Sequence, residues 1–330
     1  MEIKAYTPAN KMSITNLSPA PPFLNDYTDM WLIGSRGYMN TKKIYPFYFL
    51  ILPLGIYTLL YFTPSLFSFY YALTDWNTYN EGMRFIGLDN FRDMLKESAL
   101  YWEYITHTFE FALSTTLLKN LLGLSLALLL NEGLRTKNVL RSIFYLPVTI
   151  SPLIIGLIFS SVFDPSHGLI NSVLGEIGLE SWKHAWLVDV KFAMLSVVSV
   201  ETWKFIGFNM IIYLAGLQTI SRSYYEAASI DGSSKWQQFV HITLPLIMPA
   251  ITINLILNLI NGFKVFDLIF VLTKGGPGNT TEVLNTAVFR EFSSGRYGSA
   301  TAIGVILFLM TTLIALSTLS LLSRRSEASE

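Results

Sequence analysis

Long apolar runs alternate with short polar segments along the chain. Runs without a charged residue occupy positions 44–74, 142–163, 205–221, 242–263 and 297–323. A helix needs about 20 residues to cross a hydrocarbon core about 30 Å thick, and four of these runs reach that length. The run 205–221 reaches it when it is extended back to Phe192. Each of these segments therefore predicts a transmembrane helix.

A sixth predicted span covers residues 105–131 and contains the charged residue Lys119. Helices satisfy their backbone hydrogen bonds internally, whereas open strands cannot do so in lipid. We therefore expect an all-α polytopic membrane protein with six transmembrane helices. Lys119 lies too deep to reach the membrane surface easily, so we expect it to face the protein interior or a partner.

The spans predict how the chain is organised. No signal peptide is recognised in the first 43 residues, which read as a polar cytoplasmic tail. The expected order is an N-terminal tail (1–43), a first transmembrane helix (44–74), an extracellular loop (75–104), a five-helix core (105–322) with a polar segment at 221–243, and a cytoplasmic tail (323–330).

Lysine and arginine decide the orientation. They are denser in the short segments on one side than in the longer loops on the other, and cytoplasmic loops carry this excess. An even number of spans puts both termini on one side. We therefore expect both termini and the segment 221–243 in the cytoplasm. The residues on this side are Arg36, Lys42, Lys43, Arg135, Lys137, Arg141, Arg222, Lys235, Arg324 and Arg325.

Composition supports the membrane class and narrows the chemistry. Hydrophobic residues make up 52% of the chain and charged residues 14%, whereas soluble domains carry about 25% charged residues. The chain has no cysteine and a net charge of zero. These values exclude a disulfide framework, thiol chemistry and a strongly basic nucleic-acid-binding protein.

Recognisable catalytic chemistry is missing from the sequence. No G-x-x-x-x-G-K-[ST] loop that could hold a nucleotide phosphate occurs. The four histidines are scattered without metal-ligand spacing, and nothing resembles a set of nucleophile, base and orienting residue. We therefore expect a chain that is not an enzyme and has no catalytic residue, no metal site and no bound cofactor.

The polar segment between the fourth and fifth spans carries the most specific pattern. It opens with Glu226-Ala227-Ala228, turns at Asp231-Gly232 and closes on Leu244-Pro245. Two alanines allow close approach of another backbone, Glu226 offers a charge, and Gly232 permits a reversal with positive φ. Ser234 and Gln237 predict a capping box that starts a second short helix. The alternative is an ordinary amphipathic loop.

This segment resembles the EAA loop of permease subunits in ATP-binding-cassette (ABC) importers. The resemblance implies that the segment forms a cytoplasmic coupling helix seated in a cleft of an ATPase subunit, with Glu226, Ala227, Ala228, Asp231, Gly232, Leu244 and Pro245 as coupling residues. The chain departs from the family pattern at Ser221, where proline is usual, and at Ser233, where alanine is usual.

Further motifs, from about residue 46 to residue 322, resemble the carbohydrate-uptake branch of these permeases, which contains the maltose-type importers. The resemblance implies a type I ABC importer permease fold of the first-permease type, in the cell membrane of a prokaryote. Its implied partners are a second permease, two cytoplasmic ATPases that bind ATP and Mg, and an extracellular solute-binding protein. The motifs are FIGLDNF (85–91), RSIFYLP (141–147), WKFIGFN (203–209), LAGLQ (214–218), and Phe266-Asp267 followed by LTKGGPGNTTE (272–282).

Polar residues of the fifth span suggest a path for a solute. Asn254, Asn258 and Asn261 recur at i, i+4 and i+7, so they lie on one helical stripe. Their amides suit hydroxyl-rich sugars, and Phe263 and Phe266 could stack on sugar faces. Asparagines also bridge helices in lipid, and this alternative stays open.

Charged residues accompany this stripe. Lys264 and Asp267 follow it at a spacing that allows them to pair. In the fourth span, Glu201 and Lys204 are expected to form a structural ion pair, because unpaired charges in a span are costly.

Two other polar positions of the fourth span belong to the expected path. Trp203 is an interface aromatic or a platform for a sugar ring, and Asn209 is a second amide within the apolar run.

The expected function is import of a sugar or oligosaccharide by alternating access. Closure of the ATPases would move the segment 226–238 as a rigid body, while Pro245 and Pro249 shape the entry of the fifth span by removing backbone donors. A polyol or a sugar phosphate is the alternative substrate. A stand-alone secondary transporter is the alternative class, but such proteins often contain two inverted halves, and no internal repeat is present.

Overall fold

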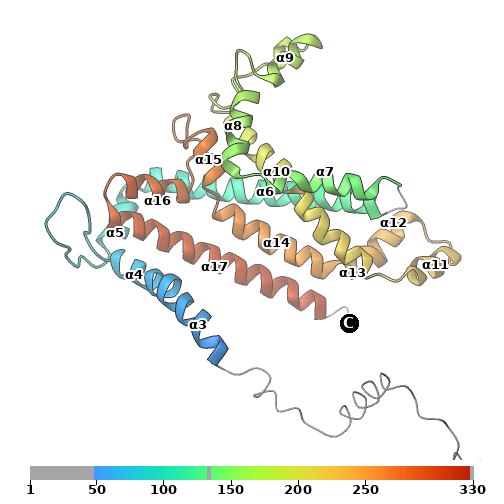
Figure 1. Cartoon of the computed structure of the whole chain (residues 1–330), viewed down its shortest axis with the longest axis horizontal. Helices are drawn as coiled ribbons and strands as arrows, with labels where there is room; N and C mark the ends of the chain where they lie inside the picture. Colours follow the sequence, from blue (N-terminus) through green and yellow to red (C-terminus); the bar gives the residue numbers. More distant parts are fainter. Residues whose placement is uncertain (1–47, 132–134, 328–330) are drawn as a thin grey trace, which may run out of the picture. The chain divides into compact units, whose positions relative to one another are not determined.

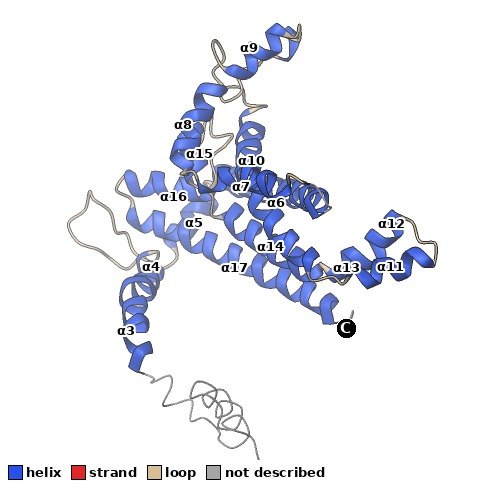
Figure 2. Cartoon of the chain, turned by 45° about the vertical axis from the view of Figure 1, so that its right-hand side comes forward, coloured by secondary structure: helices blue, strands red, loops and turns tan. Residues whose placement is uncertain are grey.

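The computed structural model describes residues 48–131 and 135–327, so the expected N-terminal tail lies outside the described residues. The described residues form helices joined by loops, with one isolated bridge between Thr74 and Phe85 and no strand within these ranges (Figure 2). The expectation of an all-α protein is confirmed for this part of the chain.

Turns and loops of different lengths connect the helices (Figure 1). They are α3 (Tyr48–Tyr57), the π-helical turn η1 (Thr58–Phe62), α4 (Thr63–Tyr71), α5 (Asp89–Lys96), α6 (Ser98–Asn131), α7 (Lys137–Thr149), α8 (Pro152–Val162), α9 (Leu169–Glu176), the 3₁₀ turn η2 (Glu180–Trp182), α10 (Ala193–Gln218), α11 (Arg222–Ile230), α12 (Lys235–Gln238), the π-helical turn η3 (Phe239–Thr243), α13 (Leu244–Leu246), α14 (Met248–Phe263), α15 (Asp267–Leu272), α16 (Leu284–Ser293) and α17 (Tyr297–Glu327).

Two compact units divide the chain, residues 1–63 and residues 64–330. In the first unit, α3 and η1 carry almost only apolar side chains, and all of them are exposed. A helix surface of exposed apolar side chains is typical of contact with lipid. The helical run that includes them continues to Tyr71 and is long enough to span a membrane.

The second unit is built around α10. This helix packs against α6, α7 and α14, and α14 packs in turn against α17 (Figure 1). Gly207 allows the close approach of α7, because a Cβ at this position would collide with the backbone of Phe144. The central position of α10 explains why most of its apolar and polar side chains alike are buried.

Within the described residues, four helices are long and apolar enough to cross a membrane, and the number of candidate spans is six if each of two bent pairs counts as one span. The single helices cover Tyr48–Tyr71, Ala99–Asn131, Ala193–Gln218 and Tyr297–Leu322. The fourth predicted span therefore does begin next to Phe192, and it includes Glu201 and Lys204.

The predicted span over residues 142–163 is not one continuous helix. α7 and α8 meet at an angle of 98°. Ile150 and Ser151, at the break, have extended ψ values of 137° and 138°. Pro152 explains the extended conformation of Ser151, because proline disfavours a helical conformation at the preceding residue and has no N–H to donate. The apolar composition of the run hides this break.

The fifth predicted span is also bent. The segment Lys235–Leu246 and the helix α14 meet at an angle of 66°. Ile247 lies at the break, between Pro245 and Pro249. The two prolines thus flank the entry of this span, as the sequence predicts.

Short helices cover the connections at the other ends of the spans. α5 lies in the loop 75–104. α9 and η2 follow the bent pair, and α15 and α16 separate α14 from α17. The sequence does not predict α16, although this helix packs against both α6 and α17.

Candidate functional site

The helix α11 is closed at both ends by local hydrogen bonds. Ser221, where the family usually has proline, is the N-cap and accepts a hydrogen bond from the Ser223 amide. At the other end Gly232 has a φ of +78°. Its amide donates to the Ser229 carbonyl at 3.2 Å, and the Ser233 amide donates to Ala228 at 3.0 Å. This pair of bonds is a Schellman motif, which glycine permits at almost no conformational cost.

The capping box predicted for α12 is confirmed. The Ser234 hydroxyl accepts from the Gln237 amide at 3.3 Å, and the Gln237 side chain accepts from the Ser234 amide at 2.8 Å. We call residues 221–243 the coupling segment. Figures 1 and 2 both show its helices α11 and α12 at one extremity of the second unit.

The coupling segment exposes groups that a second protein could bind. Glu226 is exposed and forms neither an ion pair nor a side-chain hydrogen bond within the described residues. Exposed apolar side chains accompany it: Ile230 is 87% exposed and Trp236 71%. Apolar groups of this size on a short polar segment are typical of an interaction surface.

The predicted coupling residues do not all lie on this surface. Glu226, Ala227, Asp231 and Gly232 are exposed. Ala228 is half-buried and lines a cavity of about 360 Å³ with Asp231 and Gly232. Leu244 and Pro245 are half-buried in α13, next to the bend at Ile247. Leu244 and Pro245 therefore lie where the segment joins the fifth span. The residues that are free to touch a partner are the exposed ones, Glu226, Ala227, Asp231 and Gly232.

Hydrogen bonds that sequence reasoning missed brace the coupling segment. The buried Gln238 side chain donates to the Ser229 hydroxyl at 2.9 Å, which ties α12 to α11. The Tyr225 and Thr243 hydroxyls lie 2.9 Å apart and tie α11 to η3. These two bonds hold α11, α12 and η3 together. No sequence motif marks these pairs, because their members lie 9 and 18 residues apart.

The asparagine stripe of the fifth span is divided between two environments. Asn254 and Asn258 are buried and face α10. The Asn258 amide donates to the Asn209 side chain at 2.5 Å, and Asn254 donates to the Asn209 carbonyl at 3.3 Å. Asn261 is exposed. The three buried amides link α10 and α14, as interhelical asparagines do in lipid, and only Asn261 is accessible to a solute.

The outer end of the stripe is more open. Lys264 and Asp267 are exposed and form no ion pair among the described residues, so the expected pair is absent. The reason is that α14 ends at Phe263 and α15 begins only at Asp267, which removes the helical geometry that the spacing needs.

The aromatic residues near this stripe also differ in accessibility. Trp203 is 44% exposed and lies edge-on to Phe159, with ring centroids 5.2 Å apart. Phe263 is buried against Phe109 and cannot stack on a sugar. Phe266 is half-buried in a group with Phe270 and Phe289.

The ion pair of the fourth span differs from the one that the sequence predicts. Glu201 pairs with Lys119 of α6 at 2.8 Å, and both side chains are buried. Lys204 is also buried and lies over the Phe205 ring at 5.2 Å. The prediction that Glu201 pairs with Lys204 is therefore wrong, because helix packing brings a closer cation from α6. Lys119 faces the protein interior, as expected.

A second ionic group holds α16 in place. Glu282 is buried and lies 3.5 Å from Arg290, which also contacts the Tyr104 hydroxyl. Burial raises the pKa of the Glu282 carboxyl, and the nearby Arg290 partly opposes that shift. Glu291 pairs with Arg296 through two hydrogen bonds of 2.5 and 2.6 Å. The contacts of Arg290 connect Glu282, at the end of the loop 272–282, to Tyr104 of α6.

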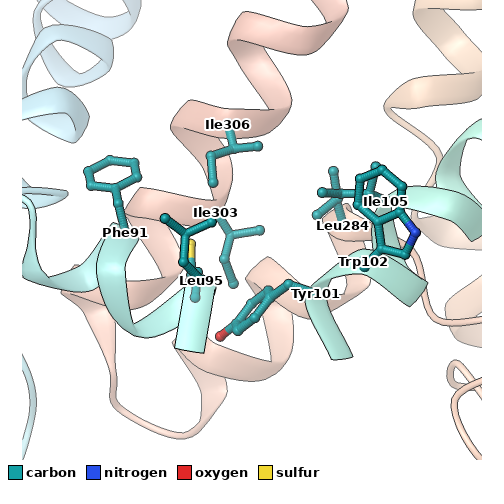
Figure 3. A pocket seen from close by; sticks show the side chains of 9 residues that line it. Phe91, Leu95, Tyr101, Trp102, Ile105, Leu284, Ile303 and Ile306 are labelled. Atoms are coloured by element: carbon teal, nitrogen blue, oxygen red, sulfur yellow. The ribbon is translucent and has the colours of Figure 1, made fainter. Parts of the chain in front are cut away.

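An apolar cavity of about 330 Å³ lies between α5, α6 and α17. Figure 3 shows Phe91 and Leu95 on one side of it, Trp102 and Ile105 on another, and Ile303 between them. A hydroxyl-rich solute needs hydrogen-bonding partners. This lining offers almost none, so the cavity is not a sugar site.

Comparison with known proteins identifies the family. Residues 119–327 match the family of binding-protein-dependent transport system inner membrane components. The probable starch degradation products transport system permease protein AmyD of Thermoanaerobacterium thermosulfurigenes is 36% identical over 79% of this chain and 88% of that protein. The trehalose/maltose transport system permease protein MalF of Thermococcus litoralis is 35% identical over 80% of this chain and 88% of that protein.

A solved structure agrees with these relatives. The crystal structure of a bacterial ABC transporter involved in the import of the acidic polysaccharide alginate contains a chain that is 26% identical, with a TM-score of 0.73 over 92% of this chain and 99% of that one. The fold is that of a type I ABC importer permease. The chain therefore belongs to the family of binding-protein-dependent transport system inner membrane components, as a permease subunit of an ABC importer.

Proposed function

We propose that this permease imports a sugar or an oligosaccharide and that cytoplasmic ATPases drive it through the coupling segment. The observation that carries the coupling proposal is the exposed, internally braced pair α11 and α12, with Glu226 free of any partner among the described residues. ATP and Mg act on the ATPases, since no phosphate loop occurs in this chain. The names of the relatives, which mention starch degradation products and trehalose or maltose, support the substrate class.

The proposed assembly contains a second permease, two ATPases and an extracellular solute-binding protein. A related alginate transporter was crystallised with a periplasmic protein that holds an alginate pentasaccharide, which supports the last of these partners. In the proposed topology each bent pair counts as one span, so six spans place both termini and residues 221–243 in the cytoplasm. The proposed organisation keeps a first transmembrane helix at 44–74 and a core at 105–322.

Co-purification tests this assembly. We expect the tagged chain, solubilised in mild detergent from its own cells, to bring down an ATPase and a second permease. The Glu226→Ala variant, which removes an exposed charge and leaves every brace in place, should retain the second permease and lose most of the ATPase. Purification of the unmodified chain as a functional monomer would instead favour a secondary transporter.

The proposed solute path uses the accessible polar residues near the end of α14. Asn261, Lys264 and Asp267 are exposed there, and Trp203 offers a partly exposed ring. Asn209, Asn254 and Asn258, which were expected on the same path, act in this proposal as the bond between α10 and α14.

Alanine substitutions separate the two roles. Asn261→Ala should reduce uptake several-fold and leave the unfolding temperature unchanged, because its side chain is exposed. Asn258→Ala should destabilise the protein by about 1–3 kcal/mol, because the buried Asn209 loses its partner. Uptake by reconstituted vesicles and thermal unfolding in detergent measure the two effects. Equal uptake by Asn261→Ala and the unmodified protein would remove Asn261 from the path.

A further inference from the structure

A third cavity, of about 1000 Å³, opens between the ends of two spans and the coupling segment. Asn131 and Gln218 line it, and they are the last residues of α6 and α10. Both helices are candidate membrane spans that end at these residues. In the proposed orientation, the cavity therefore lies at the cytoplasmic ends of these two spans.

Two cations line this cavity, and neither is paired with a carboxylate among the described residues. Arg222 begins α11 and Lys235 begins α12, and both are exposed. Within the described residues neither side chain forms an ion pair or a hydrogen bond, and the carboxylates of the same segment, Glu226 and Asp231, are not part of the lining. Two cations that line one cavity without an ion pair among the described residues favour an anion with several acceptor oxygens.

The remaining walls combine polar donors with apolar surface. The exposed amides of Asn131 and Gln218 carry no side-chain hydrogen bond among the described residues. Leu217, Phe239 and the 71% exposed Trp236 supply the apolar part. Tryptophan is typical of membrane interfaces, where one side of a site is apolar and the other is wet. This lining suits a ligand with an anionic head and an apolar body.

We propose that this cavity binds a phosphate-bearing anion, with Arg222 and Lys235 as its charged ligands. Basic pockets between transmembrane helices on the cytoplasmic side bind phospholipid headgroups in this way. The apolar walls favour an anionic phospholipid as the source of the phosphate over a soluble one. The inference rests on the proposed orientation, which places the coupling segment in the cytoplasm.

Such a ligand would connect the coupling segment to the spans. The phosphate would bridge the first residues of α11 and α12 across the ends of α6 and α10. It would thereby add a contact between the moving segment and the membrane-embedded helices, in addition to the hydrogen bond between Tyr225 and Thr243.

Native mass spectrometry of the full-length chain tests the site. The purified protein is loaded with phosphatidylglycerol or with phosphatidylcholine, and the retained lipid is counted during stepwise activation. The variant Arg222→Gln/Lys235→Gln removes both cations. The control Arg135→Gln/Lys137→Gln removes the same charge from positions outside the cavity. Each lost charge near the surface weakens binding about fivefold, so phosphatidylglycerol should bind the cavity variant about 30-fold more weakly and the control unchanged.

Competition with inorganic phosphate identifies the source. Retention of phosphatidylglycerol in the presence of millimolar phosphate supports a lipid site, and its displacement supports a site for a soluble phosphate. Equal lipid and phosphate binding by the cavity variant and the control would overturn the proposal. The measurement requires neither an ATPase nor transport, so its failure is separate from a failure of the proposed function.

Discussion

Gly232→Pro is expected to abolish solute uptake and solute-stimulated ATPase activity while the protein still inserts into the membrane. Gly232 has a φ of +78°, whereas proline is fixed near −65°. Proline also lacks the N–H that Gly232 donates to Ser229. The Schellman motif cannot form, so α11 loses its closure and its fixed angle to α12. The spans do not depend on this turn, and insertion should be unaffected.

A matched control separates coupling from a general effect of proline. Gly178 has the same φ of +78°, has open space around it and donates a comparable hydrogen bond to Gly175. Gly178→Pro, in the loop after α9, should leave the ATPase attached. Gly232→Asn should retain most of the activity, because asparagine tolerates the left-handed conformation. Normal uptake by Gly232→Pro would show that the coupling segment does not transmit the motion.

Lys119→Met is expected to destabilise the protein by about 3–5 kcal/mol, because it leaves Glu201 buried without its closest cation. The double variant Lys119→Met/Glu201→Met should recover most of this loss, since apolar residues often replace a buried ion pair at little cost. Lys204 loses the attraction of Glu201 together with the smaller repulsion of Lys119, so the recovery in the double variant should be incomplete. Thermal unfolding in detergent measures the three proteins.

An exposed ion pair provides the comparison. Lys96 and Asp93 lie 2.6 Å apart and both are largely exposed, so Lys96→Met should cost less than about 1 kcal/mol. If Lys119→Met is no more harmful than Lys96→Met, the buried pair is not a structural link between α6 and α10. If the double variant is as unstable as the single one, the loss comes from packing and not from the unpaired charge.

The local features of the coupling segment follow from short-range chemistry, and the sequence predicts them accurately. Gly232 adopts the positive φ that a helix end favours, and Ser234 and Gln237 form the expected capping box. The spacing of these residues is enough, because each interaction closes within six residues. The departures from the family pattern are explained locally too: Ser221 caps α11, and the Ser233 hydroxyl donates to Ala228 at 2.7 Å.

Long-range partners follow no such rule. Lys119 and Glu201 are 82 residues apart, and Asn209 and Asn258 are 49 apart. A periodic stripe shows that Asn254, Asn258 and Asn261 share a helix face but not that α10 covers only two of them. The hydropathy of the run 142–163 does not reveal the bend at Ser151 either, because the bend follows from Pro152.

The sequence by itself determined that this chain is an all-α membrane protein with a capped polar segment between its fourth and fifth candidate spans. Apolar run length and nearest-neighbour hydrogen bonds are sufficient for these features. Only the tertiary structure decided which charges and amides meet and which polar residues stay accessible. These features depend on the packing of α6, α10 and α14, because burial in a membrane protein is set by the neighbouring helix and not by the residue's own helix.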